Sequence, residues 1–159
     1  MKPRIDFSKV SPAAINALRS VEAHVAACGL EHSLLHLVKM RASQVNGCAY
    51  CLDMHSKDAR ALGETEQRLY ALDAWHETPF FSARERAALA WTEALTRISE
   101  THAPDDVFQE AREQFSEAEL ANLSVAIAMI NAWNRLAIGL RAVPGSYQPA
   151  KRTEAAAAH

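Results

Sequence analysis

The sequence predicts an all-α fold, a single domain of about seven helices. Signals that start or stop helices recur along the chain, and no segment shows a convincing run of alternating apolar and polar residues. Only 5 glycines and 6 prolines occur in 159 residues, which is too few for a turn-dense all-β protein. The hydrophobic content of 49% supplies enough apolar side chains for a sizeable core.

Each predicted helix in the first half of the chain has recognisable ends. Ser11 is a candidate N-cap, and Pro12 stands at the first helical position, where proline is tolerated. Asn46-Gly47 separates the second helix from the third, and Gly63 is suited to end the third in the left-handed conformation. Four helices are therefore expected, over residues 12–28, 33–45, 48–62 and 66–76.

Two capping boxes mark helix starts in the second half of the chain. One pairs Ser82 with Glu85 and the other pairs Ser116 with Glu119. The helices expected here cover residues 83–98, 104–115 and 116–140. A Val-Pro-Gly turn then follows, so the expected organisation is an N-terminal arm, a helical domain and a flexible C-terminal tail, over residues 1–10, 11–143 and 144–159.

Composition and charge exclude several classes of function. The net charge is -2 and no lysine- and arginine-rich block occurs, so no nucleic-acid partner is expected. Residues 120–140 are rich in apolar side chains, but they include three asparagines and Arg135, which would be costly in hydrocarbon. We therefore expect no contact with a membrane. Because the first residues lack the apolar region of a signal peptide, we expect a cytoplasmic protein with reduced thiols.

The segment that carries chemistry is residues 46–55, Asn-Gly-Cys-Ala-Tyr-Cys-Leu-Asp-Met-His. If a helix begins at Cys48, then Cys48, Cys51 and His55 share one face, because three and then four residues separate them. Two thiols one turn apart are within reach of a disulfide, and the free N–H groups of a helix start favour a thiolate. His55 adds a base or a cation. This arrangement suits redox chemistry, in which one thiolate attacks an oxidant and its neighbour resolves the product.

Two other interpretations of this segment stay open. The cysteines could be small apolar side chains on a helix that faces the core. Alternatively, Cys48, Cys51 and His55 could bind a metal with His36 as the fourth ligand. A structural zinc site more often joins two separated ligand pairs, and no second pair occurs in the sequence. His55 at helical spacing favours the redox interpretation, so we expect neither a metal nor a cofactor.

The chain resembles a known family in two segments. Residues 39–55, Lys-Met-Arg-Ala-Ser-Gln-Val-Asn-Gly-Cys-Ala-Tyr-Cys-Leu-Asp-Met-His, look like the core motif of the alkyl hydroperoxidase D family, within the carboxymuconolactone decarboxylase-like superfamily. Residues 131–136, Asn-Ala-Trp-Asn-Arg-Leu, are similar to a second recurring segment of its small members. The specific part is the Cys-x-x-Cys-x-x-x-His pattern, which the decarboxylase branch generally lacks. With helix order and length, the resemblance covers residues 10–143.

The resemblance implies an antioxidant enzyme that reduces a hydroperoxide substrate without metal or haem and is restored by an external dithiol reductant. In that family the second cysteine of the motif is peroxidatic and the first is resolving, which makes Cys51 the nucleophile and Cys48 its partner. The helix dipole alone favours Cys48, which lies nearer the helix start. The spacing of Cys51 and His55 favours Cys51, because His55 can take its proton. We therefore expect Cys51 to form the sulfenic acid.

One position departs from the family pattern. Twelve residues before the first motif cysteine, the family usually has a glutamate that assists the histidine in a proton relay, and here that residue is His36. A hairpin at Asn46-Gly47 should bring His36 back beside Cys51 and His55. We therefore include His36 among the candidate catalytic residues. The plainer interpretation is a half-buried histidine on an amphipathic helix.

The predicted helix over residues 116–140 is apolar on most sides, which is difficult to cover in a domain of this size. Other subunits are expected to supply part of the cover, and the resemblance points to a homo-oligomer, a trimer or a hexamer. Two rival functions remain. One is a redox- or metal-responsive binding protein that uses the Cys/His cluster. The other is a superfamily member that acts on a small organic substrate, with cysteines that are only structural.

Overall fold

The computed structural model describes residues 1–149, and all the regular structure within this range is helical. The all-α single domain predicted from the sequence is confirmed. Nine α-helices and one 3-10 helix (η1) follow in the described part of the chain: α1 Phe7–Val10, α2 Pro12–Ala27, α3 His32–Asn46, α4 Ala49–Ala61, α5 Glu66–Ala71, η1 Leu72–Glu77, α6 Ala83–Thr96, α7 Ile98–Thr101, α8 Asp105–Gln114 and α9 Glu117–Gly139.

The helix count exceeds the expected seven for local reasons. Helices α1 and α7 are single turns of four residues, which are too short to show a periodic pattern. The helix expected over residues 66–76 is divided into α5 and η1, and the backbone leaves helical geometry at Ala74 (φ −111°, ψ 33°). Beside this kink Trp75 is buried, and its Nε1 donates to Glu93 Oε1 at 2.7 Å. Both predicted capping boxes form, at the starts of α6 and α9.

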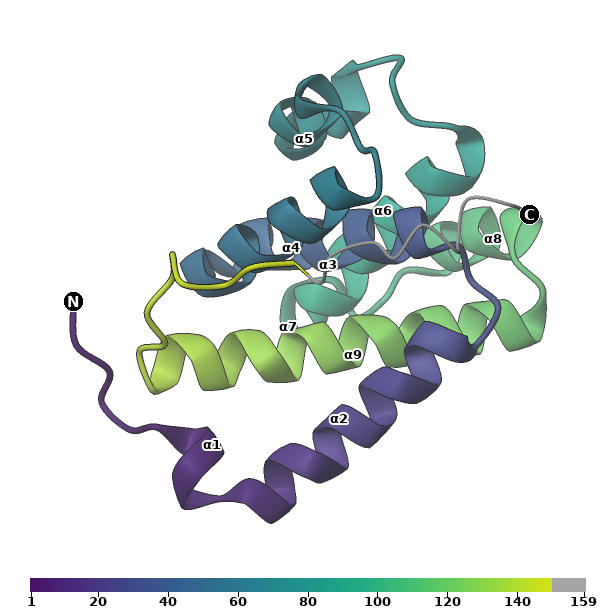
Figure 1. The fold of residues 1–159 in the computed structure, drawn as a ribbon. Coiled ribbons are helices and arrows are strands. Elements are labelled where there is room, and N and C mark those ends of the chain that lie inside the picture. The colour runs from purple at the N-terminus through teal and green to yellow at the C-terminus, as the bar shows by residue number, and fades with distance from the viewer. Residues whose placement is uncertain (150–159) are drawn as a thin grey trace.

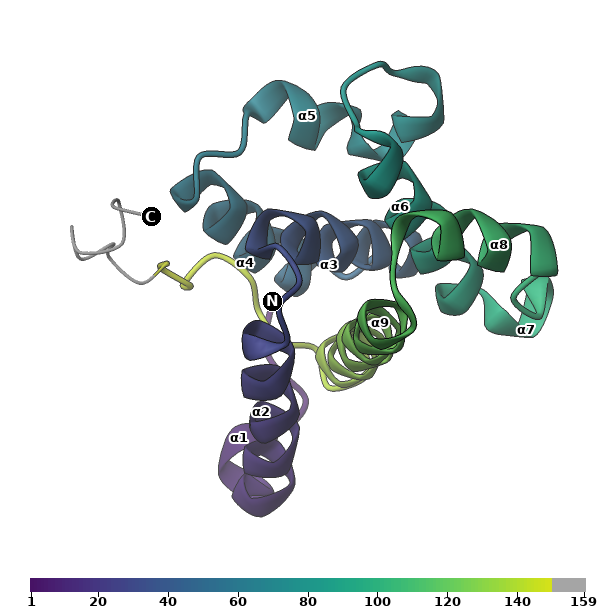
Figure 2. The same ribbon diagram turned by 90° about the vertical axis from the view of Figure 1, so that its right-hand side faces the viewer.

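Helix α3 is the centre of the arrangement, because it packs against α4, α6 and α9. Helix α9, the longest, runs across the molecule beneath α3 and α4 (Figure 1). Helix α2 contacts α9 and joins the core through Val25, while much of its length projects from the body, as the view along α9 shows (Figure 2). The α3–α4 hairpin therefore lies between α9 on one side and the α5 region on the other.

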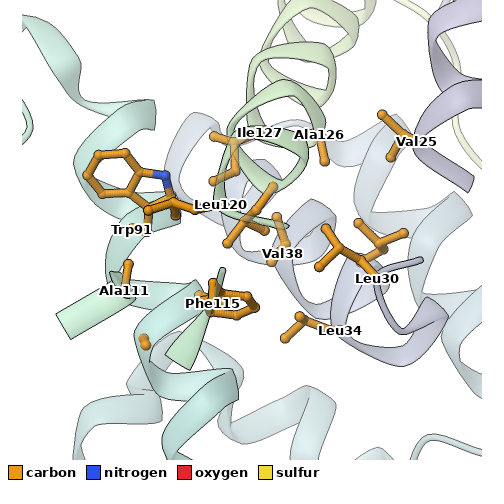
Figure 3. Packing of buried hydrophobic residues seen from close by; sticks show 14 of the residues in the cluster. Val25, Leu30, Leu34, Val38, Trp91, Ala111, Phe115, Leu120, Ala126 and Ile127 are labelled. Atoms are coloured by element: carbon orange, nitrogen blue, oxygen red, sulfur yellow. The ribbon is translucent and has the colours of Figure 1, made fainter. Parts of the chain in front are cut away.

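The buried apolar side chains form three clusters. The largest joins α2, α3, α6, α8 and α9 and includes the fully buried Val38 and Ile127 (Figure 3). A second cluster lies around Leu37, between α3, η1 and α6. The third, which we call the thiol cluster, contains both motif cysteines and joins the α3–α4 hairpin to α9: Ala42, Cys48, Cys51, Ile130 and Ala137.

The polar residues of α9 have partners inside the fold. Asn46 Nδ2 donates to Asn131 Oδ1 at 2.9 Å and to Asn134 Oδ1 at 2.8 Å, so the end of α3 is tied to α9. Asn134 Nδ2 donates in turn to Ser43 Oγ at 3.1 Å. Buried amide groups need such partners, and these hydrogen bonds explain why the otherwise apolar helix α9 contains buried asparagines. Within residues 1–149, no helix has both the length and the apolar character needed to span a membrane.

The chain beyond α9 returns to α4 over its described residues. The backbone N–H of Gly145 donates to Asp53 Oδ2 at 3.0 Å, and the Tyr147 hydroxyl donates to Asp58 Oδ1 at 2.7 Å. At the other end, the backbone N–H of Arg4 donates to Leu140 O at 2.9 Å, which ties the expected N-terminal arm to the end of α9. The tail expected over residues 144–159 extends past the described residues, from 150 onward.

Candidate functional site

The Cys-x-x-Cys segment lies at the start of α4, as the sequence predicts. Gly47 turns the chain in the left-handed conformation (φ 68°, ψ 34°), which glycine adopts without the strain a side chain would add. The backbone N–H of Cys48 then donates to Ser43 O at 2.9 Å and closes the end of α3. Cys48 is the N-cap residue of α4, and Cys51 follows in the first turn. A single glycine turn thus sets both the hairpin and the position of the thiols.

Both motif thiols are free and almost completely buried, with Cys48 1% exposed and Cys51 2% exposed. They lie in the thiol cluster, and two polar side chains, Asn134 and Ser43, favour the thiolate forms by hydrogen bonding. Cys28 lies elsewhere, at the end of α2, where it packs half-buried against the largest core cluster. The structure therefore brings Cys48 and Cys51 together and leaves Cys28 apart.

The two thiols share one proton. A hydrogen bond from the Cys51 thiol lowers the pKa of Cys48 to about 7, and the backbone N–H groups of Cys51 and Tyr50 act in the same direction. The same contact raises the pKa of Cys51, because its proton is held by the neighbouring thiolate and its own burial disfavours a charge. The two thiols therefore titrate as a coupled pair, and the hydrogen bond between them favours a thiolate on Cys48 over one on Cys51.

The two candidate histidines lie close together. The rings of His36 on α3 and His55 on α4 have centroids 5.9 Å apart. Burial lowers the pKa of His55 to about 3, and the positive charge of Lys39 adds to the effect. Burial also lowers the pKa of His36, although the Asp58 carboxylate opposes it. His55 is therefore a neutral imidazole at physiological pH, not the cation that the sequence left open.

A cavity of about 280 Å³ gives access to the cysteine pair. Cys51 and His55 line it, whereas Cys48 is absent from the described residues of its wall. The wall is mainly apolar, with two charged residues from α2, and consists of Phe7, Ser8, Ile15, Arg19, Glu22, Tyr50, Cys51, Met54, His55, Trp133 and Ala137. Tyr50, between the two cysteines in sequence, is one of the aromatic residues of this wall. Of the two motif cysteines, Cys51 is therefore the one next to the cavity.

The sequence did not single out two acidic residues of this region. Asp58 lies one turn after His55 on α4, with Oδ2 3.8 Å from His55 Nδ1, and its i,i+3 spacing is a signal that could have identified it. Glu22 lines the cavity from α2. It accepts hydrogen bonds from Lys39 Nζ at 2.6 Å and from Trp133 Nε1 at 3.2 Å. These partners are 17 and 111 residues away in sequence, so no local pattern marks Glu22.

Comparisons with known proteins agree on the family. The model of the carboxymuconolactone decarboxylase family matches residues 11–94. The uncharacterised protein YdfG of Bacillus subtilis is 38% identical over 140 residues, which are 88% of this chain and 95% of YdfG.

Solved structures share the fold. A protein of unknown function from Agrobacterium tumefaciens, with a suggested role in antioxidant defence as an AhpD, superposes with a TM-score of 0.86 at 45% identity. The match covers 94% of this chain and 100% of that one. The debrominase Bmp8 superposes with a TM-score of 0.74 at 22% identity over 85% of this chain and 73% of its own, a likeness of fold alone.

Proposed function

This chain belongs to the carboxymuconolactone decarboxylase family, and on that premise we propose that it is a thiol-dependent peroxidase of the alkyl hydroperoxidase D type. Its substrate class is hydroperoxides, and its role is antioxidant defence. The observation that carries the proposal is the pairing of a cysteine that lines a cavity with a second cysteine behind it. Cys51 lines the cavity beside His55, and Cys48 adjoins it in the thiol cluster.

The cavity wall favours Cys51 as the nucleophile, whereas the pKa shifts favour a thiolate on Cys48. A proton that moves between the two sulfurs resolves this difference. The resting thiolate is mainly on Cys48, because the Cys51 thiol stabilises it. Transfer of one proton from Cys51 to Cys48 moves the charge to the sulfur that faces the cavity. Attack then proceeds from the minor form, since only that form presents a thiolate to the substrate. We therefore assign the peroxidatic role to Cys51 and the resolving role to Cys48.

The proposed reaction balances as two thiols and one hydroperoxide giving one disulfide, one alcohol and one water. The Cys51 thiolate attacks the terminal peroxide oxygen, the O–O bond breaks, and the leaving alkoxide takes a proton to become the alcohol. The Cys48 sulfur then attacks the sulfenic acid and forms the disulfide, and the released hydroxide leaves as water with the second thiol proton. An external dithiol reduces the disulfide by thiol–disulfide exchange.

In this proposal His55 accepts and releases protons during the reaction but is neutral in the resting protein. Its pKa of about 3 makes the protonated form short-lived, but a neutral imidazole beside Cys51 can accept a proton and return it to the leaving oxygen. His36, 5.9 Å from His55 between ring centroids, occupies the family's glutamate position and would pass the proton onward. Both are neutral groups, so we expect a slower relay than one that contains a carboxylate.

The direct test is peroxide consumption by the reduced protein with a dithiol donor, followed by mass spectrometry of the peptides. We expect stoichiometric peroxide to form one intramolecular disulfide, between Cys48 and Cys51, while Cys28 stays reduced because it packs against a separate cluster. Unchanged thiols at all three positions after peroxide treatment would refute the proposal.

The rate of oxidation should depend on pH through the cysteine pair. Because the pKa of Cys48 is lowered to about 7, the thiolate fraction rises as the pH rises through that value. Below it, the rate of disulfide formation should fall about tenfold per pH unit, and above it the rate should level off. Stopped-flow oxidation from about pH 5 to pH 9 measures the midpoint. A rate that does not change with pH across this range would contradict this assignment.

A second candidate function follows from the shape of the cavity. Its volume of about 280 Å³ and its apolar wall, which includes Phe7, Tyr50 and Trp133, would also accept a small organic ring. The debrominase Bmp8, which shares the fold, indicates that the fold hosts other chemistry. In that case Cys51 would act on a bound organic substrate, and hydroperoxide would leave the pair unchanged.

We also propose that the protein is a homo-oligomer, a trimer or a hexamer. Helix α9 keeps two large apolar side chains exposed, Val125 and Ile138, although its other faces are covered by α2, α3 and α6. Helix α2 stands out from the body (Figure 2) and offers a further surface for a second copy. The boundaries predicted from the sequence, with the N-terminal arm ending at residue 10 and the helical domain ending at residue 143, also remain proposals.

A further inference from the structure

A second group of polar side chains meets inside the α3–α4 hairpin. His36, His55 and Asp58 each offer a ligand atom, and these three atoms lie within 4.8 Å of one another. His55 Nδ1 and Asp58 Oδ2 lie 3.8 Å apart, which is too long for a hydrogen bond. The cysteines belong to a different set, the thiol cluster.

The two imidazoles have unused nitrogen atoms. The Nδ1 atoms of His36 and His55 are both buried, and neither has a hydrogen-bond partner within residues 1–149. His55 is only 6% exposed, so solvent does not satisfy this atom either. A buried polar atom without a partner costs about 1–3 kcal/mol, and native proteins contain few of them. Two such atoms beside one carboxylate indicate a ligand that binds all three groups.

We propose that His36, His55 and Asp58 form a binding site for a divalent transition-metal ion, with Zn²⁺ as the representative. Two imidazole nitrogens and one carboxylate oxygen are a donor set that zinc accepts, with a fourth position open. Zinc bonds of about 2.1 Å place neighbouring tetrahedral ligand atoms roughly 3.4 Å apart. The 3.8 Å separation of His55 Nδ1 and Asp58 Oδ2 is close to this value, so small side-chain rotations would complete the site.

The surroundings of Asp58 resemble the outer shell of a metal site. The Tyr147 hydroxyl donates to Asp58 Oδ1 at 2.7 Å, which fixes the carboxylate through one oxygen while the other is the one nearest His55. The nearby cation, Lys39, is paired with Glu22 at 2.6 Å, so its charge is largely compensated. A dication would therefore meet one uncompensated carboxylate and two unoccupied nitrogens.

An ion can reach this group without passing the thiols. A hollow of about 230 Å³ between α3, α4 and α6 is lined by His36 and by Arg68, a cation that is paired with Glu64 and Glu85 of the same wall. It is distinct from the cavity that reaches Cys51, whose described lining includes His55 but not His36. The proposed metal site thus connects two hollows through the His36–His55 pair.

Metal binding would also regulate the thiols, a consequence that rests on the proposed function. A metal ion on His55 occupies a lone pair that the relay needs, so Zn²⁺ should slow peroxide consumption. The binding itself needs no peroxidase activity. It is therefore measured separately, on reduced protein without peroxide.

The test is calorimetric titration of the reduced, metal-stripped full chain with Zn²⁺, together with the absorption spectrum of the Co²⁺ form. We expect one ion per chain. His36→Gln and Asp58→Asn should each weaken binding by about tenfold or more, since loss of an outer-shell partner already costs that much. Asp53→Asn is the matched control, because Asp53 is also an α4 carboxylate but pairs with Lys57 at 2.9 Å. Circular dichroism melts verify that each variant is folded.

A double variant, Cys48→Ser with Cys51→Ser, separates this site from a thiolate site. It should bind Zn²⁺ as the parent does, and the Co²⁺ spectrum of the parent should lack a thiolate-to-cobalt charge-transfer band. Loss of binding in this variant, with His36→Gln and Asp58→Asn unaffected, would overturn the proposal in favour of cysteine ligands. The absence of Zn²⁺ binding by the parent would also refute it, and neither outcome would affect the peroxidase test.

Discussion

Replacing Cys51 with serine is expected to abolish peroxide consumption, with a fall of about a thousandfold or more in rate. Serine has nearly the size of cysteine, but its hydroxyl does not ionise near neutral pH and cannot accept the peroxide oxygen. Because Cys51 is the cysteine that lines the cavity, no other thiol in the described chain replaces it there. The measurement is the steady-state rate with a dithiol donor.

Two companion variants make this result specific. Cys48→Ser should still react once and then retain a sulfenic acid on Cys51, which a dimedone adduct detects by mass spectrometry. Cys28→Ser should behave as the parent, because Cys28 lies in a separate cluster. If Cys51→Ser keeps the parent rate while Cys48→Ser is inactive, the roles of the two cysteines are reversed. The lowered pKa of Cys48 makes that the principal alternative.

Replacing Asn134 with alanine should lower the free energy of unfolding by about 2–4 kcal/mol. Asn134 is fully buried, accepts from Asn46 Nδ2 at 2.8 Å and donates to Ser43 Oγ at 3.1 Å. Alanine removes one hydrogen bond from each partner and creates a small void between α3 and α9, although Asn46 still donates to Asn131 and Ser43 still donates to Lys39 O. Denaturation in urea measures the loss.

The same change should raise the pKa of Cys48, because Asn134 favours its thiolate by hydrogen bonding. The matched control is Asn122→Ala on the same helix, where the amide is half-exposed and its contact with His24 is 3.4 Å. This control should cost less than about 0.5 kcal/mol. Equal losses in the two variants would show that the buried amide network contributes little to stability.

Hydrogen bonds, and not positive charges, define the electrostatics of the proposed site. The thiolate of Cys48 is favoured by Cys51, by Asn134 and by backbone N–H groups of the first turn of α4. Lys39 is paired with Glu22, and the buried His55 is uncharged. The start of α4 therefore lowers the pKa of Cys48 through hydrogen bonds, and Arg19 in the cavity wall is not among the causes of that shift.

The sequence alone was sufficient for the helical elements whose signals are local. The capping boxes at Ser82 and Ser116 form as predicted, and Gly47 turns the chain where Asn46-Gly47 indicated. The break between α5 and η1 could not be predicted from local sequence signals. Its kink at Ala74 accompanies the burial of Trp75 and the hydrogen bond to Glu93, a contact 18 residues away in sequence.

For the site, the sequence by itself determined the spacing of Cys48, Cys51 and His55 on one helix, because helical periodicity depends only on residue number. It also located the hairpin that brings His36 to His55. Only the tertiary structure decided which cysteine faces a cavity, since Phe7, Ile15 and Trp133 come from distant parts of the chain. The tertiary structure also decided the charge of His55: the packing of α3 and α9 against α4 removes water, and desolvation, which no local pattern encodes, keeps the imidazole neutral.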